Sequence, residues 1–173
     1  MSECSTRVYS LWLVPAPGSS ARRQLQATIT DLGAEVEDTP VFEPYVTVIG
    51  GLNGESAALE ETTRALGTRT APLDLAFDSI HWSTTRHQCV FLLMEPILRL
   101  VELHRAAQEA VEETSSAYHP HLSLIYSNMD LADRRDLAQS VNMAMLPSGT
   151  TCPILQLIDT VGRSSSGKRS PLF

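Results

Sequence analysis

The sequence has few cysteines, and nothing in their spacing suggests that they pair. Cys4, Cys89 and Cys152 make an odd count, with no Cys-x-x-Cys pair and no histidine spacing typical of a metal site. We therefore expect neither a disulfide framework nor a bound metal, and a reducing, cytoplasmic environment fits this cysteine usage better than an oxidising one.

Long apolar runs are also missing. The apolar runs, such as residues 90–94, are far too short to span a bilayer. Residues 1–7 lack the charged segment followed by a long apolar stretch that marks a secretory signal. The sequence therefore predicts no association with a membrane.

Positive charge is scarce as well. The 173 residues contain 13 lysines and arginines against 20 acidic residues, which gives a formal net charge of −7. Such a chain has no general attraction for long RNA or DNA, although a few local donors can still hold a small anionic ligand. The length fits one domain, or two small lobes around one core, and we expect a monomer because such a domain can bury its own core.

Short helical and strand-like patterns alternate along the chain. We expect strands over residues 9–14, 42–49, 73–82, 88–94, 121–126 and 154–161, and helices over 20–32, 56–66, 97–113 and 132–145. This mixture, with short links, predicts an α+β sandwich of sheets and helices. We assign residues 1–162 to a single domain and expect the serine-rich, basic segment 163–173 to be a mobile tail.

One loose internal echo is the most informative feature. Residues 44–48 read Pro-Tyr-Val-Thr-Val, and residues 120–124 read Pro-His-Leu-Ser-Leu. Both have a proline, a ring, an aliphatic residue, a hydroxyl and a second aliphatic residue at the start of a predicted strand. A single motif of this kind is usually a core strand with a satisfied polar group, but its repetition favours a functional role.

The echo places four polar side chains in a chemically useful set. Residues two apart share a strand face, so Tyr45 projects with Thr47, and His121 projects with Ser123. If the two strands lie side by side, these groups line one groove. Opening a cyclic phosphate needs a base, an acid and neutral donors to the phosphoryl oxygens, and rings and hydroxyls of this kind can supply them.

These residues resemble the signature of the 2H phosphoesterase superfamily, which carries two His-x-Thr/Ser motifs, one in each lobe of a pseudo-twofold fold. Plant and fungal cyclic phosphodiesterases have motifs resembling Phe-Glu-Pro-His-x-Thr-x-x-Gly and Pro-His-Leu-Ser-Leu-x-Tyr. Here residues 42–50 read Phe-Glu-Pro-Tyr-Val-Thr-Val-Ile-Gly, and residues 120–126 read Pro-His-Leu-Ser-Leu-Ile-Tyr. Residues 9–15, 88–96 and 158–162 also resemble strands of that family.

The resemblance implies an α+β, two-lobed, LigT-like fold, with antiparallel sheets flanked by helices around a central cleft. It implies hydrolysis of a 2′,3′-cyclic nucleotide, or of ADP-ribose 1″,2″-cyclic phosphate, without a metal or other cofactor. Tyr126 falls at a family position that lines the cleft. Trp82 and His81 precede the mid-chain strand, where the family also places pocket residues, although for Trp82 core packing is at least as good an interpretation.

Tyr45 departs from the family pattern because it stands at the first histidine position. A free tyrosine has a pKa of about 10, against about 6.5 for histidine, so Tyr45 is suited to donating a hydrogen bond or a proton and not to acting as a base. We hypothesise that His121 activates water, that Tyr45 protonates or polarises the leaving oxygen, and that Thr47 and Ser123 hold the phosphate.

A substitute for the missing histidine has one candidate near the second motif. His119 lies two residues before His121 and shares its strand face if the strand begins early, although the intervening Pro120 favours a loop. His119 is therefore a possible ligand contact and a possible substitute proton carrier.

Three interpretations of Tyr45 stay open at this point. A native tyrosine could give a slower or altered hydrolase, or a site turned to another reaction or to binding; alternatively, the tyrosine was introduced to disable the enzyme. The alternative function is accordingly a non-catalytic binder of a nucleotide or small anion in the same cleft. A scaffold protein is a third possibility with little support, since no long amphipathic segment is present.

Overall fold

The computed structural model describes residues 7–113 and 117–160. Helices and strands follow in this order: β1 (Tyr9–Val14), α1 (Ser20–Glu35), β2 (Val46–Leu52), α2 (Ser56–Arg69), β3 (Leu73–Trp82), β4 (Val90–Met94), α3 (Leu98–Ala110), β5 (His121–Ile125), α4 (Leu131–Ser140), a 3-10 turn (Met143–Met145), β6 (Gly149–Cys152) and β7 (Ile154–Asp159). The predicted tail lies outside the described residues. Among those described, no helix is both long and apolar enough to cross a membrane.

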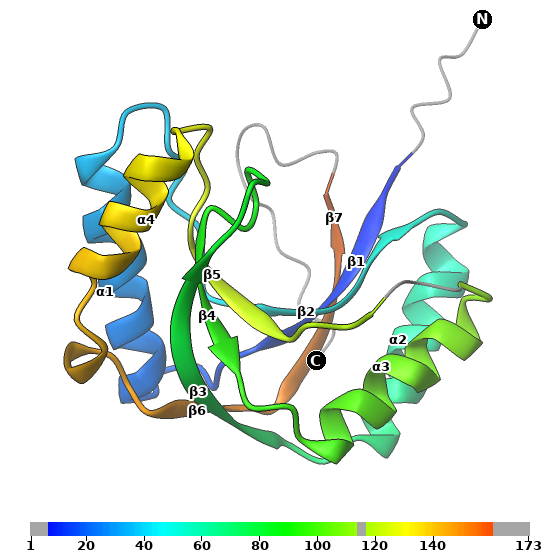
Figure 1. Ribbon diagram of the computed structural model, residues 1–173. Coiled ribbons are helices and arrows are strands. Elements are labelled where there is room, and N and C mark those ends of the chain that lie inside the picture. The colour runs from blue at the N-terminus through cyan, green and yellow to red at the C-terminus, as the bar shows by residue number, and fades with distance from the viewer. Residues whose placement is uncertain (1–6, 114–116, 161–173) are drawn as a thin grey trace, which may run out of the picture.

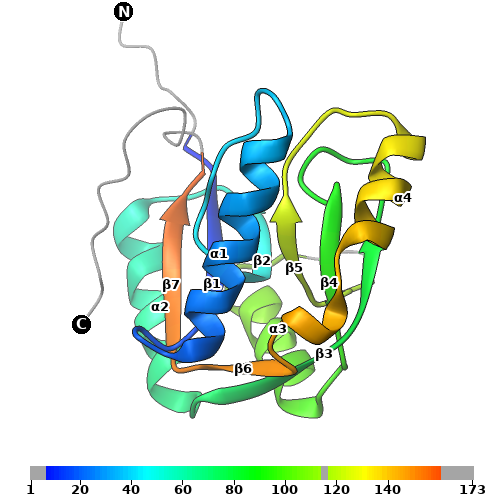
Figure 2. The same ribbon diagram turned by 90° about the vertical axis from the view of Figure 1, so that its left-hand side faces the viewer.

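Two antiparallel sheets form the centre of the molecule. One has the strand order β2-β1-β7, and the other has the order β5-β4-β3-β6. Helices α1 and α4 lie against the four-stranded sheet, whereas α2 and α3 lie against the three-stranded sheet (Figures 1 and 2). The two-lobed α+β arrangement expected from the sequence is therefore confirmed.

The helices are exchanged between the lobes. α1 directly follows β1 in the chain but packs against β5 of the other sheet, and α3 follows β4 but packs against β2. The predicted apolar stripe of α1, Leu25, Ile29 and Leu32, is buried as its helical spacing requires. Because each lobe depends on a helix that the other lobe supplies, the two sheets share a single core.

Glycines were misread at the ends of two predicted elements. β2 begins at Val46 rather than at residue 42, and it continues through Gly50 and Gly51 to Leu52. The predicted end of this strand at residue 49 was wrong, because Gly51 adopts a φ of 75° that lets the strand bend and continue. α1 likewise runs through Gly33, which a helix tolerates at a cost of about 1 kcal/mol.

Strand β6 was missing from the sequence prediction. It has only four residues, and it begins at Gly149, where an added Cβ would come within 2.4 Å of the Leu75 carbonyl oxygen. The glycine is therefore needed for β6 to pair closely with β3. Only Pro153 separates β6 from β7, so the chain passes from one sheet to the other within a single residue.

The guanidinium of Arg134 clasps the turn between β3 and β4. The residue lies in α4, is 5% exposed, and donates to the carbonyl oxygens of Ser83 at 2.7 Å and Thr85 at 2.8 Å. It also donates to Met129 at 2.8 Å and Ser127 at 3.2 Å, so it joins two loops through one side chain. Such charge-assisted bonds are stronger than neutral ones, and both loops are fixed as a result.

Replacing Arg134 with methionine should lower the free energy of unfolding by about 2–4 kcal/mol, because four carbonyl oxygens lose a charged donor that is itself buried. Urea denaturation measures this change. The matched control is Arg135→Met on the exposed side of the same helix, which should alter stability by less than about 0.5 kcal/mol. Equal losses in the two variants would contradict the role of the clasp.

Candidate active site

The two strands that carry the echo meet where the two sheets face each other. β2 is an edge strand of the three-stranded sheet, and β5 is an edge strand of the four-stranded sheet. The two strands are therefore not hydrogen-bonded to each other in one sheet. They nevertheless contact across the gap, and the Tyr118 hydroxyl donates to the Thr47 carbonyl oxygen at 2.9 Å. This seam brings the two motifs together.

A cavity of about 250 Å³ opens at the seam. It is lined by Ser10, Trp12, Tyr45, Thr47, His87, His121, Ser123, Tyr126 and Thr160. All four predicted catalytic residues and the predicted pocket residue Tyr126 therefore share one cavity.

His121 is arranged as a proton acceptor. Its Nδ1 lies 2.8 Å from the His119 carbonyl oxygen, which can only accept, so Nδ1 carries the proton and Nε2 keeps its lone pair. The side-chain amide of Gln88 donates to Nε2 at 3.3 Å. Burial lowers the pKa of His121 below its ordinary value of 6.5, and the hydrogen bond to the His119 carbonyl oxygen offsets only part of this effect, so the neutral base prevails at pH 7.

An aromatic wall holds Tyr45 in place. Its ring stacks on Trp12 with centroids 3.4 Å apart and an interplanar angle of 5°. The Tyr45 and Tyr126 hydroxyls share a hydrogen bond, and Tyr126 in turn stacks on Phe42 with centroids 4.1 Å apart. The phenol of Tyr45 is therefore fixed both by its ring and by its hydroxyl.

The two hydroxyl residues differ in their present bonding. Ser123 is buried, and its Oγ donates to the His87 carbonyl oxygen at 2.7 Å. Thr47 lines the same cavity from β2 and is half-buried. Since hydroxyl protons rotate, both oxygens can turn a donor toward an anion, but Ser123 must first give up its bond to the turn.

Two predicted ligand contacts lie elsewhere. Trp82 ends β3 and is 39% exposed, and it does not line the cavity. The side chain of His119 is exposed and also lies off the lining, although its carbonyl oxygen orients His121. Both residues are near site strands in the sequence, but their side chains are exposed to solvent. Trp82 lies at the end of a strand and His119 lies in a loop, and neither side chain points into the cavity.

Sequence reasoning missed four lining residues: Ser10, Trp12, His87 and Thr160. Ser10 and Trp12 are two apart on β1, a spacing that would have placed them on one face had that strand been examined for polar groups. His87 lies in a turn, where periodicity gives no information about direction.

No cluster of three or more His, Cys, Asp or Glu side chains that could hold a metal ion occurs in residues 7–113 and 117–160.

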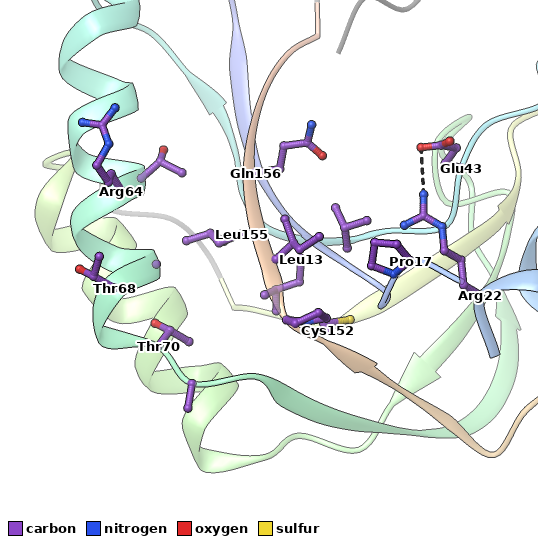
Figure 3. A pocket seen from close by; sticks show the side chains of 16 residues that line it. Leu13, Pro17, Arg22, Glu43, Arg64, Thr68, Thr70, Cys152, Leu155 and Gln156 are labelled. Carbon is purple, nitrogen blue, oxygen red and sulfur yellow. Dashed lines mark ion pairs between the residues drawn. The ribbon is translucent and has the colours of Figure 1, made fainter. Parts of the chain in front are cut away.

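A larger cavity of about 480 Å³ lies apart from this site, between α2 and β7. Figure 3 shows its floor of Leu13 and Leu155, with Thr68 of α2 on one side and the ion pair between Arg22 and Glu43, 3.4 Å long, on the other. It shares no lining residue with the smaller cavity and contains no histidine. The smaller cavity is therefore the better candidate for proton-transfer chemistry.

Comparison with known proteins identifies the family of the chain. The model of the family described as "Cyclic phosphodiesterase-like protein" matches residues 8–150, which include both strand motifs and most of the cavity lining. The chain belongs to this cyclic phosphodiesterase-like family. It is thereby a member of the 2H phosphoesterase superfamily that the two motifs resemble.

Named members of the family are distant but cover most of the chain. A cyclic phosphodiesterase of Arabidopsis thaliana is 28% identical over 141 residues, covering 79% of this chain and 74% of the relative. A 2′,3′-cyclic-nucleotide 3′-phosphodiesterase of Yarrowia lipolytica is 24% identical over 169 residues, covering 74% of this chain and 78% of the relative.

The fold of the family is likewise found in LigT. The structure of E. coli LigT in complex with NADP+ matches with a TM-score of 0.60 at 12% identity, covering 98% of this chain and 96% of LigT. At that identity the match shows the shared fold alone, which is the LigT-like architecture expected from the cyclic phosphodiesterase-like sequence.

The protonation state of His121 can be measured directly. Because burial disfavours the imidazolium, NMR titration of the ring should give a midpoint below pH 6.5, so that the base is lost only as the pH falls through that lower value. His121→Ala assigns the signal by removing it. A midpoint at or above 6.5 would contradict the proton-acceptor arrangement.

Proposed function

We propose that this protein is a metal-independent cyclic phosphodiesterase that hydrolyses 2′,3′-cyclic nucleotides, or ADP-ribose 1″,2″-cyclic phosphate, to a monophosphate ester. The observation that carries the proposal is the single cavity that unites the acceptor nitrogen of His121 with the hydroxyls of Thr47 and Ser123. Membership of the cyclic phosphodiesterase-like family supports the same reaction class.

In the proposed mechanism, His121 Nε2 takes a proton from a water molecule as the water oxygen bonds to phosphorus. The bond from phosphorus to one ring oxygen of the sugar then breaks. The Tyr45 hydroxyl donates a hydrogen bond to that departing oxygen, which takes up a proton supplied from solvent and leaves as a sugar hydroxyl. Thr47 and Ser123 donate to the non-bridging oxygens and stabilise the charge that develops there. Neutral donors of this kind can hold an anion despite the net charge of −7.

The aromatic wall gives the proposed ligand a second kind of contact. Rings of Trp12, Tyr45 and Tyr126 line the cavity beside the polar groups. A nucleoside has an apolar base and an ionised phosphate, and a site that has both kinds of surface suits it better than it suits inorganic phosphate alone. E. coli LigT has been solved with both kinds of ligand, in one structure with NADP+ and in another with phosphate.

A second candidate function is nucleotide binding without turnover. The hydrogen bond between the Tyr45 and Tyr126 hydroxyls favours it, because a phenol held in this way serves recognition without needing to release its proton. Activity measurements on three variants separate this candidate from hydrolysis.

Hydrolysis of 2′,3′-cyclic AMP with EDTA present should compare the parent chain, Tyr45→His and His121→Ala. We expect the parent to turn over, Tyr45→His to be faster, and His121→Ala to be slower by about 10²- to 10⁴-fold, the usual effect of losing one proton-transfer group. Activity in Tyr45→His alone would instead support the binding function. Full activity in His121→Ala would refute the proposed role of that histidine, and loss of the parent's activity to EDTA would refute metal independence.

Thr47→Val tests the phosphate contact, since valine keeps the shape of threonine and removes only the hydroxyl. KM for 2′,3′-cyclic AMP should rise by about 10-fold or more, which corresponds to a hydrogen bond to a charged group. Thr151→Val is the matched control, because Thr151 is exposed on β6 and bonds to Asp74 outside the cavity. An unchanged KM in Thr47→Val would remove Thr47 from the binding set.

A further inference from the structure

The cavity holds a second imidazole that neither strand motif contains. His87 lies in the turn between β3 and β4, and it lines the same cavity as His121. The family pattern has a histidine where this chain has Tyr45, so the site would be expected to have only one. His87 brings the number of cavity-lining histidines among the described residues back to two.

Hydrogen bonds of His87 itself and of the next residue fix the position of His87. Its carbonyl oxygen accepts from the Ser123 hydroxyl at 2.7 Å. The next residue, Gln88, closes the turn by accepting at its carbonyl oxygen from the Ser83 amide at 3.0 Å, while its side chain reaches His121. Together with the clasp of Arg134, these bonds tie the turn to β5 and α4, so His87 is held at the cavity by contacts from the site itself.

The ring of His87 lies on the Tyr45 side of the site. It meets the Tyr126 ring nearly edge-on, with centroids 5.1 Å apart and an interplanar angle of 72°, and the Tyr126 hydroxyl bonds to that of Tyr45. No described residue forms a hydrogen bond with the His87 ring nitrogens, and the side chain is exposed enough to exchange protons with solvent. His121, by contrast, packs against Phe91 and has both ring nitrogens bonded.

We propose that His87 is the catalytic acid of this site and stands in for the histidine that Tyr45 replaces; this inference rests on the proposed hydrolysis. As water oxygen bonds to phosphorus, neutral His121 accepts the proton of the water. As the bond from phosphorus to the ring oxygen breaks, protonated His87 transfers its proton to that oxygen, which leaves as a sugar hydroxyl. The products are a monophosphate ester, protonated His121 and neutral His87, and proton exchange with solvent restores the starting state.

Tyr45 then polarises the leaving oxygen without having to protonate it. Its hydroxyl is engaged with Tyr126 and its ring with Trp12, which suits a fixed hydrogen-bond donor. Histidine as a residue type changes its charge between pH 5 and 8, so an imidazole can both lose and regain a proton at neutral pH more readily than a phenol can. The division of roles therefore assigns each group the chemistry that it performs best.

The test measures hydrolysis of 2′,3′-cyclic AMP by His87→Ala and His87→Gln in the full chain. Both variants should be slower by about 10²- to 10⁴-fold, because glutamine keeps a hydrogen-bonding group but cannot transfer a proton. Added imidazole should restore His87→Ala at least 10-fold and should leave His87→Gln unchanged, since only alanine vacates the space. In a Tyr45→His background, which supplies another imidazole, His87→Gln should cost less than 10-fold.

His81→Ala is the matched control, because His81 is an exposed histidine near the end of β3 that does not line the cavity; its rate should equal that of the parent. If the parent is active and His87→Ala stays within threefold of it, the role of His87 is overturned while the proposed hydrolysis stands. A loss that imidazole does not rescue makes His87 structural and also overturns the proposal. A parent inactive on cyclic nucleotides overturns the hydrolysis and this assignment together.

Discussion

The structure depends on two sheet edges that face each other without pairing. An edge strand exposes backbone groups that must find partners, and β2 finds some of its partners in side chains instead of in a ladder shared with β5. Tyr118 donates to the Thr47 carbonyl oxygen, and the buried ring of His104 donates from Nδ1 to that of Val48 at 2.7 Å. Because the edges approach but do not join, space remains between them, and that space is the candidate active site.

The exchange of helices between the lobes holds the two sheets together around this space. α1 and α3 each leave their own sheet and pack on the opposite one, so separating the lobes would expose apolar surface on both. The site residues are attached to this frame through short connections: Thr47 and Ser123 sit on the edge strands themselves, and His87 sits in a turn that Arg134 and Ser123 fix. The shared core therefore fixes the positions of these site residues relative to one another.

The sequence predicted the direction of functional side chains on strands, but it did not predict their direction in turns. The alternation of Tyr45 with Thr47 and of His121 with Ser123 placed all four side chains correctly at one cavity. The same reasoning missed β6, because four residues give too little periodicity and the need for Gly149 depends on the distant Leu75 carbonyl.

Trp82 and His87 show the limit most directly. Trp82 ends β3 just before the turn, and His87 lies in the turn. The sequence predicted a ligand contact for Trp82 and none for His87, yet only His87 lines the cavity. Which residue points inward is decided by long-range hydrogen bonds from β5 and α4, and these bonds have no signature in the local sequence.

The passage from β6 to β7 bears on how the molecule can move. A single residue, Pro153, links strands of two different sheets, and proline fixes one of the two backbone torsions at that point. A hinge needs a few residues that can absorb large torsional changes, and this crossing offers almost none. The short β6–β7 connection therefore restrains a separation of the two sheets at this end of the molecule, whereas the lining rings and hydroxyls stay free of that restraint.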